Sequence, residues 1–150
     1  MDRLAAEDIW TKWGADLLAY ASMLVGPDEA ADVVQEVMAR LVATEDGAGL
    51  TRPYLFRSVL NEVRMQHRAK TRRERREWKA SEPRSEHEFL SDPDVIAAIG
   101  RLSPMQRAVV FLTYWDDLTV EAVADVLQIA PGTVKAHLAR ARALLRGVLA

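Results

Sequence analysis

The 150-residue sequence predicts an all-α protein built of two small helical domains joined by a short linker. Nearly every apolar run repeats at the three- and four-residue spacing of one helix face, and no run alternates with a period of two over β-branched residues. Residues 80–94 are polar, contain two prolines and have no clear period. We therefore expect a linker there, between domains at 1–79 and 95–150. A chain of this length holds one ordinary domain or two small ones.

Turn and capping signals place three helices in the first half. The first runs through about 4–24 and is followed by the Gly-Pro pair at 26–27. The second begins near Pro27, which puts acidic residues in its first turn, and ends near Ala43. The third has Pro53 at an early helical position and continues into a basic segment.

Capping signals also place the helices of the second half. Ser103, Pro104 and Gln106 form the pattern of a capping box at the start of a helix. Two further helices, "LTVEAVADVL" and "PGTVKAHLARARALLRGVL", are separated by "QIA". Two short helices with such a break, the second opening with Pro-Gly-Thr, predict a helix-turn-helix.

The last helix has an apolar face and a basic face. At 100° per residue, four residues fall within about 60° of one another and form the predicted core stripe: Val134, Leu138, Ala141 and Leu145. The opposite side carries only small residues: Ala136, Ala139 and Ala143. The flanks and rim carry polar or basic residues: Thr133, Lys135, His137, Arg140, Arg142 and Arg146. Because small residues allow close approach to a groove and basic flanks can bind phosphates, we predict DNA binding. The alternative is a helical hairpin with a solvated basic face.

The second helix has a polar face opposite an apolar stripe. The stripe consists of Ala30, Val34, Val37, Met38 and Leu41. The polar face consists of Asp32, Gln35, Glu36 and Arg40. By itself such a face is typical of a solvated helix surface.

The third helix has a more unusual polar face. Its predicted core residues are Leu55, Phe56, Val59, Leu60 and Val63. On the opposite side lie Arg57, Asn61, Arg64 and Arg68. Guanidinium groups at this spacing repel one another unless an anion is near. Asn61 offers a paired donor and acceptor that can bind a base edge, although a surface role without function stays open.

Charge is strongly segregated along a chain whose formal net charge is only −2. Residues 1–63 carry five basic and 11 acidic side chains, whereas residues 64–84 carry nine and three. The chain is therefore polarised into an acidic front and a basic band, and the band is either a solvated helix end or a surface that meets something anionic. For the basic run at 72–79, phosphate contact and a solvated linker both remain open.

The composition disfavours several classes of protein. There is no cysteine, which excludes disulfides and cysteine-based metal sites. His67, His87 and His137 lack a ligand-like spacing, so we expect no metal, no cofactor and no hydrolase. The acidic start lacks the features of a secretory signal, and "ADLLAYASMLVG" is too short to span a membrane. We expect a cytoplasmic protein that is not an enzyme.

Three segments in sequence resemble one protein family. They are "DVVQEVMARL", "YLFRSVLNEVRMQHR" and the run from "LSPMQR" to "ARALLR". Together they resemble the sigma-70 family of bacterial RNA polymerase initiation factors, and specifically its two-domain extracytoplasmic-function group. The resemblance covers about 28–75 and 95–147, in the family's order and with a short linker between.

The resemblance implies partners for the polar faces of the first half. The face formed by Asp32, Gln35, Glu36 and Arg40 would dock on the coiled-coil clamp of core RNA polymerase. The third helix and the loop before it, about 44–52, would recognise and help open the −10 promoter element. Asn61 matches the position that contacts a flipped base, and Arg57, Arg64 and Arg68 would contact the DNA backbone.

The resemblance also implies that the helix-turn-helix binds the −35 element, through Thr133, Lys135, His137 and Arg140. A further implied partner is an anti-sigma factor that covers these surfaces. The sequence departs from the family pattern in "ARLVATE", which lacks an aromatic pair, and at Tyr54, which is usually Trp. Ala136 and His137 replace Ser and Arg, which bears on the −35 sequence preference and not on the fold.

Two other functions are considered beside a sigma factor. One is a stand-alone helix-turn-helix regulator that binds duplex DNA as a dimer without polymerase. The other is an inactive sigma-like protein that acts only as an interaction module. The first half favours the sigma factor, because a regulator has no need of both "DVVQE" and the stripe through Arg57, Asn61 and Arg64.

Overall fold

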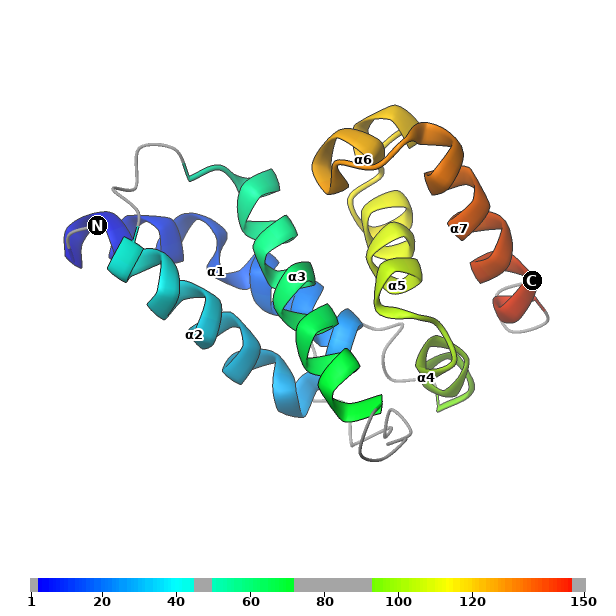
Figure 1. Cartoon of the computed structure of the whole chain (residues 1–150), viewed down its shortest axis with the longest axis horizontal. Helices are drawn as coiled ribbons and strands as arrows, with labels where there is room; N and C mark the ends of the chain where they lie inside the picture. Colours follow the sequence, from blue (N-terminus) through cyan, green and yellow to red (C-terminus); the bar gives the residue numbers. More distant parts are fainter. Residues whose placement is uncertain (1–2, 45–49, 72–92, 147–150) are drawn as a thin grey trace.

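The computed structural model describes residues 3–44, 50–71 and 93–146, and within these ranges it contains helices and no strand. The all-α prediction is confirmed. The first half forms α1 (Arg3–Val25), α2 (Pro27–Thr44) and α3 (Arg52–Thr71). The second half forms α4 (Pro93–Gly100), α5 (Pro104–Val110), the π-helix η2 (Phe111–Trp115), α6 (Val120–Leu127) and α7 (Pro131–Leu145). In Figure 1, α1–α3 lie on one side of the molecule and α4–α7 on the other.

The helices begin and end close to the predicted positions. α1 and α2 are separated by Gly26, whose φ of 89° lies in the left-handed region that glycine adopts without strain. α4 was not predicted as a separate helix, and it begins at Pro93, inside the expected linker. The remaining linker positions, 80–92, and the basic run at 72–79 lie outside the described residues.

The predicted apolar stripes form the core. All five stripe residues of α3 and all four of α7 are buried. In α2 the prediction is confirmed except that Met38 is only partly buried, while Val33 is buried in addition. Val33 precedes Val34 by one position, so the buried face of α2 is wider than a single stripe because both α1 and α3 pack on this helix.

Side-chain caps fix where α5 and α6 of the second half begin. Gln106 N donates to Ser103 Oγ at 3.1 Å, and Ser103 N donates to Gln106 Oε1 at 3.0 Å, which confirms the capping box. Thr119 Oγ1 accepts from Ala122 N at 3.1 Å and caps α6. Gln128 ends α6 in the left-handed conformation, and Pro131 then starts α7. These caps produce the two helices and the turn of the predicted helix-turn-helix.

The two halves pack directly against each other. α1 packs against α5, and α3 packs against both α5 and α6. At the centre of the contact the Tyr20 and Phe56 rings stack with centroids 4.4 Å apart. Phe111 of η2 meets them, with its centroid 5.2 Å from Tyr20 and 6.2 Å from Phe56. One apolar core therefore runs from the first half into the second.

Candidate nucleic-acid interface

The polar face of α7 is presented to solvent as the helix period requires. Thr133, Lys135 and Arg140 are exposed, while His137 is half-buried. The His137 Nδ1 atom is buried and makes no hydrogen bond within the described residues. Burial, and after it the charges of Arg140 and Arg64, lower the pKa of His137. At neutral pH its imidazole is therefore uncharged and interacts as a hydrogen-bonding group.

A side chain in the C-terminal part of α7 makes a hydrogen bond with η2. Arg142 Nε donates to the Tyr114 hydroxyl at 2.7 Å, and its guanidinium lies 5.8 Å from the centre of that ring. This contact orients one of the predicted basic flanks over the end of η2. A phosphate-binding guanidinium that is held in place loses less conformational freedom on binding.

The polar stripe of α3 also faces outward. Asn61 and Arg68 are exposed, and Arg57 and Arg64 are half-buried. The Arg57 guanidinium lies 5.7 Å from the centre of the Tyr54 ring, a cation–π contact that holds it along the helix surface. The structure thus brings all four residues to one face of one helix, with Asn61 between the guanidinium groups.

The loop before α3 is partly described. Residues 45–49 lie outside the described residues, whereas Leu50 is buried and anchors the end of the loop. Thr51 begins the helix, because its carbonyl accepts from Leu55 N at 3.0 Å and its side chain lies 3.4 Å from Tyr54 N. The predicted 44–52 loop therefore ends at a fixed point beside the polar stripe of α3.

All four predicted members of the polar face of α2 are exposed: Asp32, Gln35, Glu36 and Arg40. Arg40 also has an intramolecular partner. Its Nη2 atom donates to Oε2 of the buried Glu62 of α3 at 2.6 Å. This hydrogen bond, with smaller effects from charge, raises the pKa of Arg40. Arg40 therefore joins α2 to α3, in addition to any contact that it makes with a partner.

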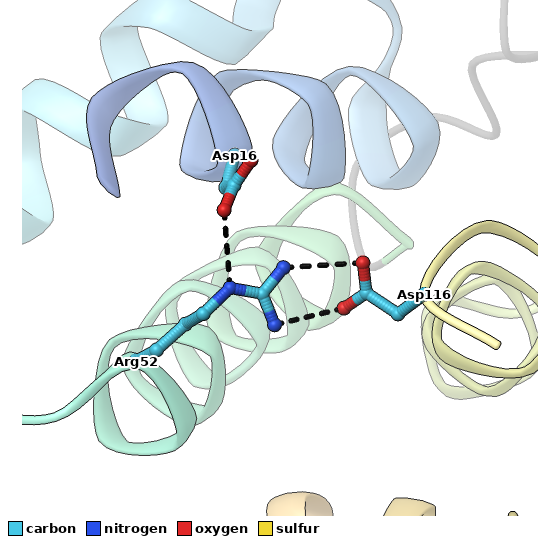
Figure 2. A network of polar contacts seen from close by, with 3 residues as sticks. All are labelled: Asp16, Arg52 and Asp116. Carbon is cyan, nitrogen blue, oxygen red and sulfur yellow. Dashed lines mark hydrogen bonds and ion pairs between the residues drawn. The ribbon is translucent and has the colours of Figure 1, made fainter. Parts of the chain in front are cut away.

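Two arginines that were not predicted individually as site residues join the two halves: Arg107, and Arg52, which is the last residue of the predicted 44–52 loop. Arg52 of α3 lies between Asp16 of α1 and Asp116 after η2, as Figure 2 shows. Arg107 of α5 is buried, and its guanidinium donates to three backbone carbonyls: those of Leu24, Ile99 and Gly100. Sequence patterns do not reveal these contacts, because the partners lie up to 83 positions away along the chain.

Within the described ranges, no group of three or more His, Asp or Glu side chains is arranged to hold a metal ion. None of the described helices is long and apolar enough to cross a membrane. The polar features that stand out are the exposed faces of α2, α3 and α7.

Comparison with known proteins identifies related chains. A family model described as "Sigma-70, region 4" matches residues 94–145. The RNA polymerase sigma-E factor of Streptomyces antibioticus is 30% identical over 146 residues, which cover 93% of this chain and 81% of that protein. The RNA polymerase sigma-E factor of Streptomyces avermitilis is also 30% identical over 146 residues, covering 93% of this chain and 82% of that protein.

Solved structures share the fold. The sigma factor RpoE of Bartonella quintana, solved with the anti-sigma factor NepR, superposes with a TM-score of 0.75 at 26% identity. That match covers 95% of this chain and 94% of the other. CnrH, solved with the cytosolic domain of CnrY, has the same fold, with a TM-score of 0.63 at 24% identity, covering 99% and 89%. The chain belongs to the sigma-70 family of RNA polymerase sigma factors, in the extracytoplasmic-function group.

Proposed function

We propose that this protein is a transcription initiation factor that binds bacterial core RNA polymerase and directs it to promoters through their −10 and −35 elements. It performs no catalysis of its own, because the polymerase carries out the chemistry. Core polymerase and promoter DNA are its partners, which makes the cytoplasm its place of action. The observation that carries the proposal is one chain with three separate exposed polar faces, on α2, α3 and α7, in a member of this family.

Each face has one proposed partner, and the chain is divided as residues 1–79, linker 80–94 and residues 95–150. The α2 face of Asp32, Gln35, Glu36 and Arg40 binds core polymerase. The α3 face of Arg57, Asn61, Arg64 and Arg68 binds the −10 element, with the loop at 44–52. The α7 face of Thr133, Lys135, His137 and Arg140 binds the −35 element. Since the sigma factor RpoE of Bartonella quintana was solved with the anti-sigma factor NepR, we further propose an anti-sigma factor as a regulator.

In-vitro transcription with core polymerase across a promoter library tests the whole proposal. We expect transcripts only when this protein, core polymerase and a matching promoter are present together. Specific binding to promoter duplex without polymerase would instead support a stand-alone regulator. Binding to core polymerase without transcription from any promoter would support an inactive interaction module.

Glu36→Lys tests the polymerase-binding face. We expect the affinity for core polymerase to fall about tenfold or more, because reversing a charge in a complementary interface introduces repulsion. Asp8→Lys is the matched control, since it makes the same charge change on the exposed surface of α1. Equilibrium binding of labelled protein to core polymerase measures both. Equal affinities for the two variants would show that the binding face is elsewhere.

Asn61→Ala tests the −10 face. We expect promoter opening to fall about 10- to 100-fold, because a lost base-edge contact costs about 1–3 kcal/mol. Core binding should stay within about twofold of the unmodified protein, since Asn61 is on a different helix from the polymerase face. Met65→Ala is the control, because Met65 is exposed one turn beyond Asn61 and its side chain offers no amide donor and acceptor for a base edge. Fluorescence of a base analogue in the −10 element reports opening, and equal loss of opening and core binding would assign Asn61 a structural role.

A further inference from the structure

The contact between the two halves has an apolar centre and two polar ends. Tyr20, Phe56 and Phe111 form the centre. At one end Arg107 is buried, with only 6% of its surface exposed. At the other end the side chain of Arg52 is 30% exposed. Arg52 is therefore the polar contact that solvent, salt or another anion can reach.

Arg52 binds carboxylates from both halves, as Figure 2 shows. Its Nη2 atom donates to Asp116 Oδ1 at 3.1 Å, and its Nη1 atom lies 2.9 Å from Asp116 Oδ2 as an ion-pair contact without hydrogen-bond alignment. Its Nε atom donates to Asp16 Oδ2 at 3.1 Å. The guanidinium also lies 4.2 Å from the centre of the Phe56 ring. One cation thus joins α1, α3 and the segment that follows η2.

The strength of this contact is set by its partial burial. The Asp116 side chain is only 12% exposed, whereas that of Asp16 is 52% exposed. The contact with Asp116 is therefore the stronger of the two, because a more buried pair is less screened by water and salt. It is also the one that crosses between the halves, since Asp16 and Arg52 both belong to the first half.

The arrangement seen here, in which α3 packs against α5 and α6, is called the closed arrangement. It holds the proposed −10 and −35 faces in one packed body, because α3 packs against α6, and α6 packs against α7 within the helix-turn-helix. The two promoter elements are separated by about 25 positions, which is about 85 Å of duplex. The two faces cannot contact both elements of one duplex in the closed arrangement.

Separation of the halves is compatible with the length of the chain. Between Thr71 and Pro93 lie 21 residues, which span at most about 75 Å when fully extended. The two halves add their own dimensions to that reach. The chain between the halves is therefore long enough for an open arrangement that reaches both promoter elements.

We propose that Arg52 and Asp116 form an intramolecular latch that holds the free protein in the closed arrangement, and that its release must precede simultaneous contact with both promoter elements. The second part of this statement, the consequence for promoter binding, rests on the proposed function. The latch itself is a property of the free chain. While it is closed, carboxylates occupy the donors that Arg52 would otherwise offer to a phosphate.

Asp116→Asn tests the latch by removing one negative charge at nearly unchanged size. Because the chain has no cysteine, Thr11→Cys and Glu121→Cys provide two exposed positions for spin labels, one in each half. We expect one short distance in the unmodified chain, measured by double electron–electron resonance on the full-length free protein. Asp116→Asn should raise the ratio of long-distance to short-distance molecules about tenfold, the usual scale for a partly exposed charged hydrogen bond.

Asp117→Asn is the matched control, because it makes the same charge change one residue away without touching Arg52. Asp117 has a φ of 53°, a conformation that asparagine also adopts readily. Circular dichroism establishes that each variant is folded, and Arg52→Gln provides a second break of the same contact. Identical distance distributions for Asp116→Asn, Arg52→Gln, Asp117→Asn and the unmodified chain would overturn the latch, as would a long distance in the unmodified chain.

The same variants separate the latch from the proposed function. Distances in the free protein require no polymerase, so they test the latch alone. In reconstituted transcription, Asp116→Asn should form promoter complexes faster than Asp117→Asn, by the same tenfold factor. If the distances shift as expected while no variant supports transcription, the proposed function fails and the latch stands. If transcription is supported and the two variants form complexes at equal rates, the proposed role of latch release is overturned.

Discussion

Arg107→Met is expected to lower the free energy of unfolding by about 3 kcal/mol or more, because it leaves buried carbonyl groups without their donor. The Arg107 guanidinium donates to Ile99 O at 3.0 Å and to Gly100 O at 3.0 Å, and it also donates to Leu24 O. Leu24 lies in the last turn of α1, and Ile99 and Gly100 end α4. The last carbonyls of a helix have no partner within it, so Arg107 caps two helices at once.

The charge of Arg107 is retained despite burial. Burial lowers the pKa of this guanidinium to about 10, which is still well above neutral pH. The negative ends of two helix dipoles meet at this cation, so the cost of desolvation is partly offset. Replacement by an apolar side chain of similar length removes the cation and leaves those dipole ends unopposed.

Urea unfolding followed by circular dichroism measures the effect. Arg101→Met is the matched control, since Arg101 is exposed and lies just after α4. Arg107→Lys should give an intermediate loss, because one ammonium group cannot reach three carbonyls in the fork geometry of a guanidinium. Equal unfolding midpoints for Arg107→Met and Arg101→Met would contradict the capping role.

Phe56→Ala is expected to lower the free energy of unfolding by about 3–5 kcal/mol. The Phe56 side chain is fully buried, stacks on Tyr20 and lies beneath the guanidinium of Arg52. Its loss opens a cavity at the point where the first half meets Phe111 of the second half. We therefore expect the two halves to unfold less cooperatively as well as at lower denaturant concentration.

A double-mutant cycle with Phe111→Ala measures the energetic coupling between Phe56 of the first half and Phe111 of the second half. Aromatic pairs contribute about 0.5–1.5 kcal/mol beyond the area that they bury, so a coupling energy of this size is expected between positions 56 and 111. Phe56→Leu is the conservative control and should cost much less than Phe56→Ala. Strict additivity of the two alanine variants would show that the two rings are not coupled across the contact between the halves.

The helices, their buried faces and their caps were predictable because they depend on residues only a few positions apart along the chain. The stripe of Val134, Leu138, Ala141 and Leu145 is buried as the helical period requires. The capping box at Ser103 depends on two residues three positions apart, and it formed as predicted. The outward placement of Asn61 follows from the same periodicity, although its contact with a base stays a prediction.

Other features could not be predicted from these patterns. The spacing of Arg40 assigns it to the polar face of α2, but its hydrogen bond to the buried Glu62 depends on how α2 and α3 meet. The π-helix η2 interrupts an apolar run that has ordinary helical spacing. The basic character of Arg52 and Arg107 was visible, whereas their partners were not, because charge patterns carry no information about contacts 64 or 83 positions away.

The sequence by itself determined which segments are helical, which face of each helix is apolar, and which residues of α2, α3 and α7 face outward. These properties depend on interactions within a few residues along the chain. Only the tertiary structure decided how the two halves meet, that one apolar core joins them, and that Arg52 and Arg107 bridge them. Those contacts depend on the mutual placement of whole surfaces, and a partly exposed cation can find a carboxylate or carbonyl on any of them.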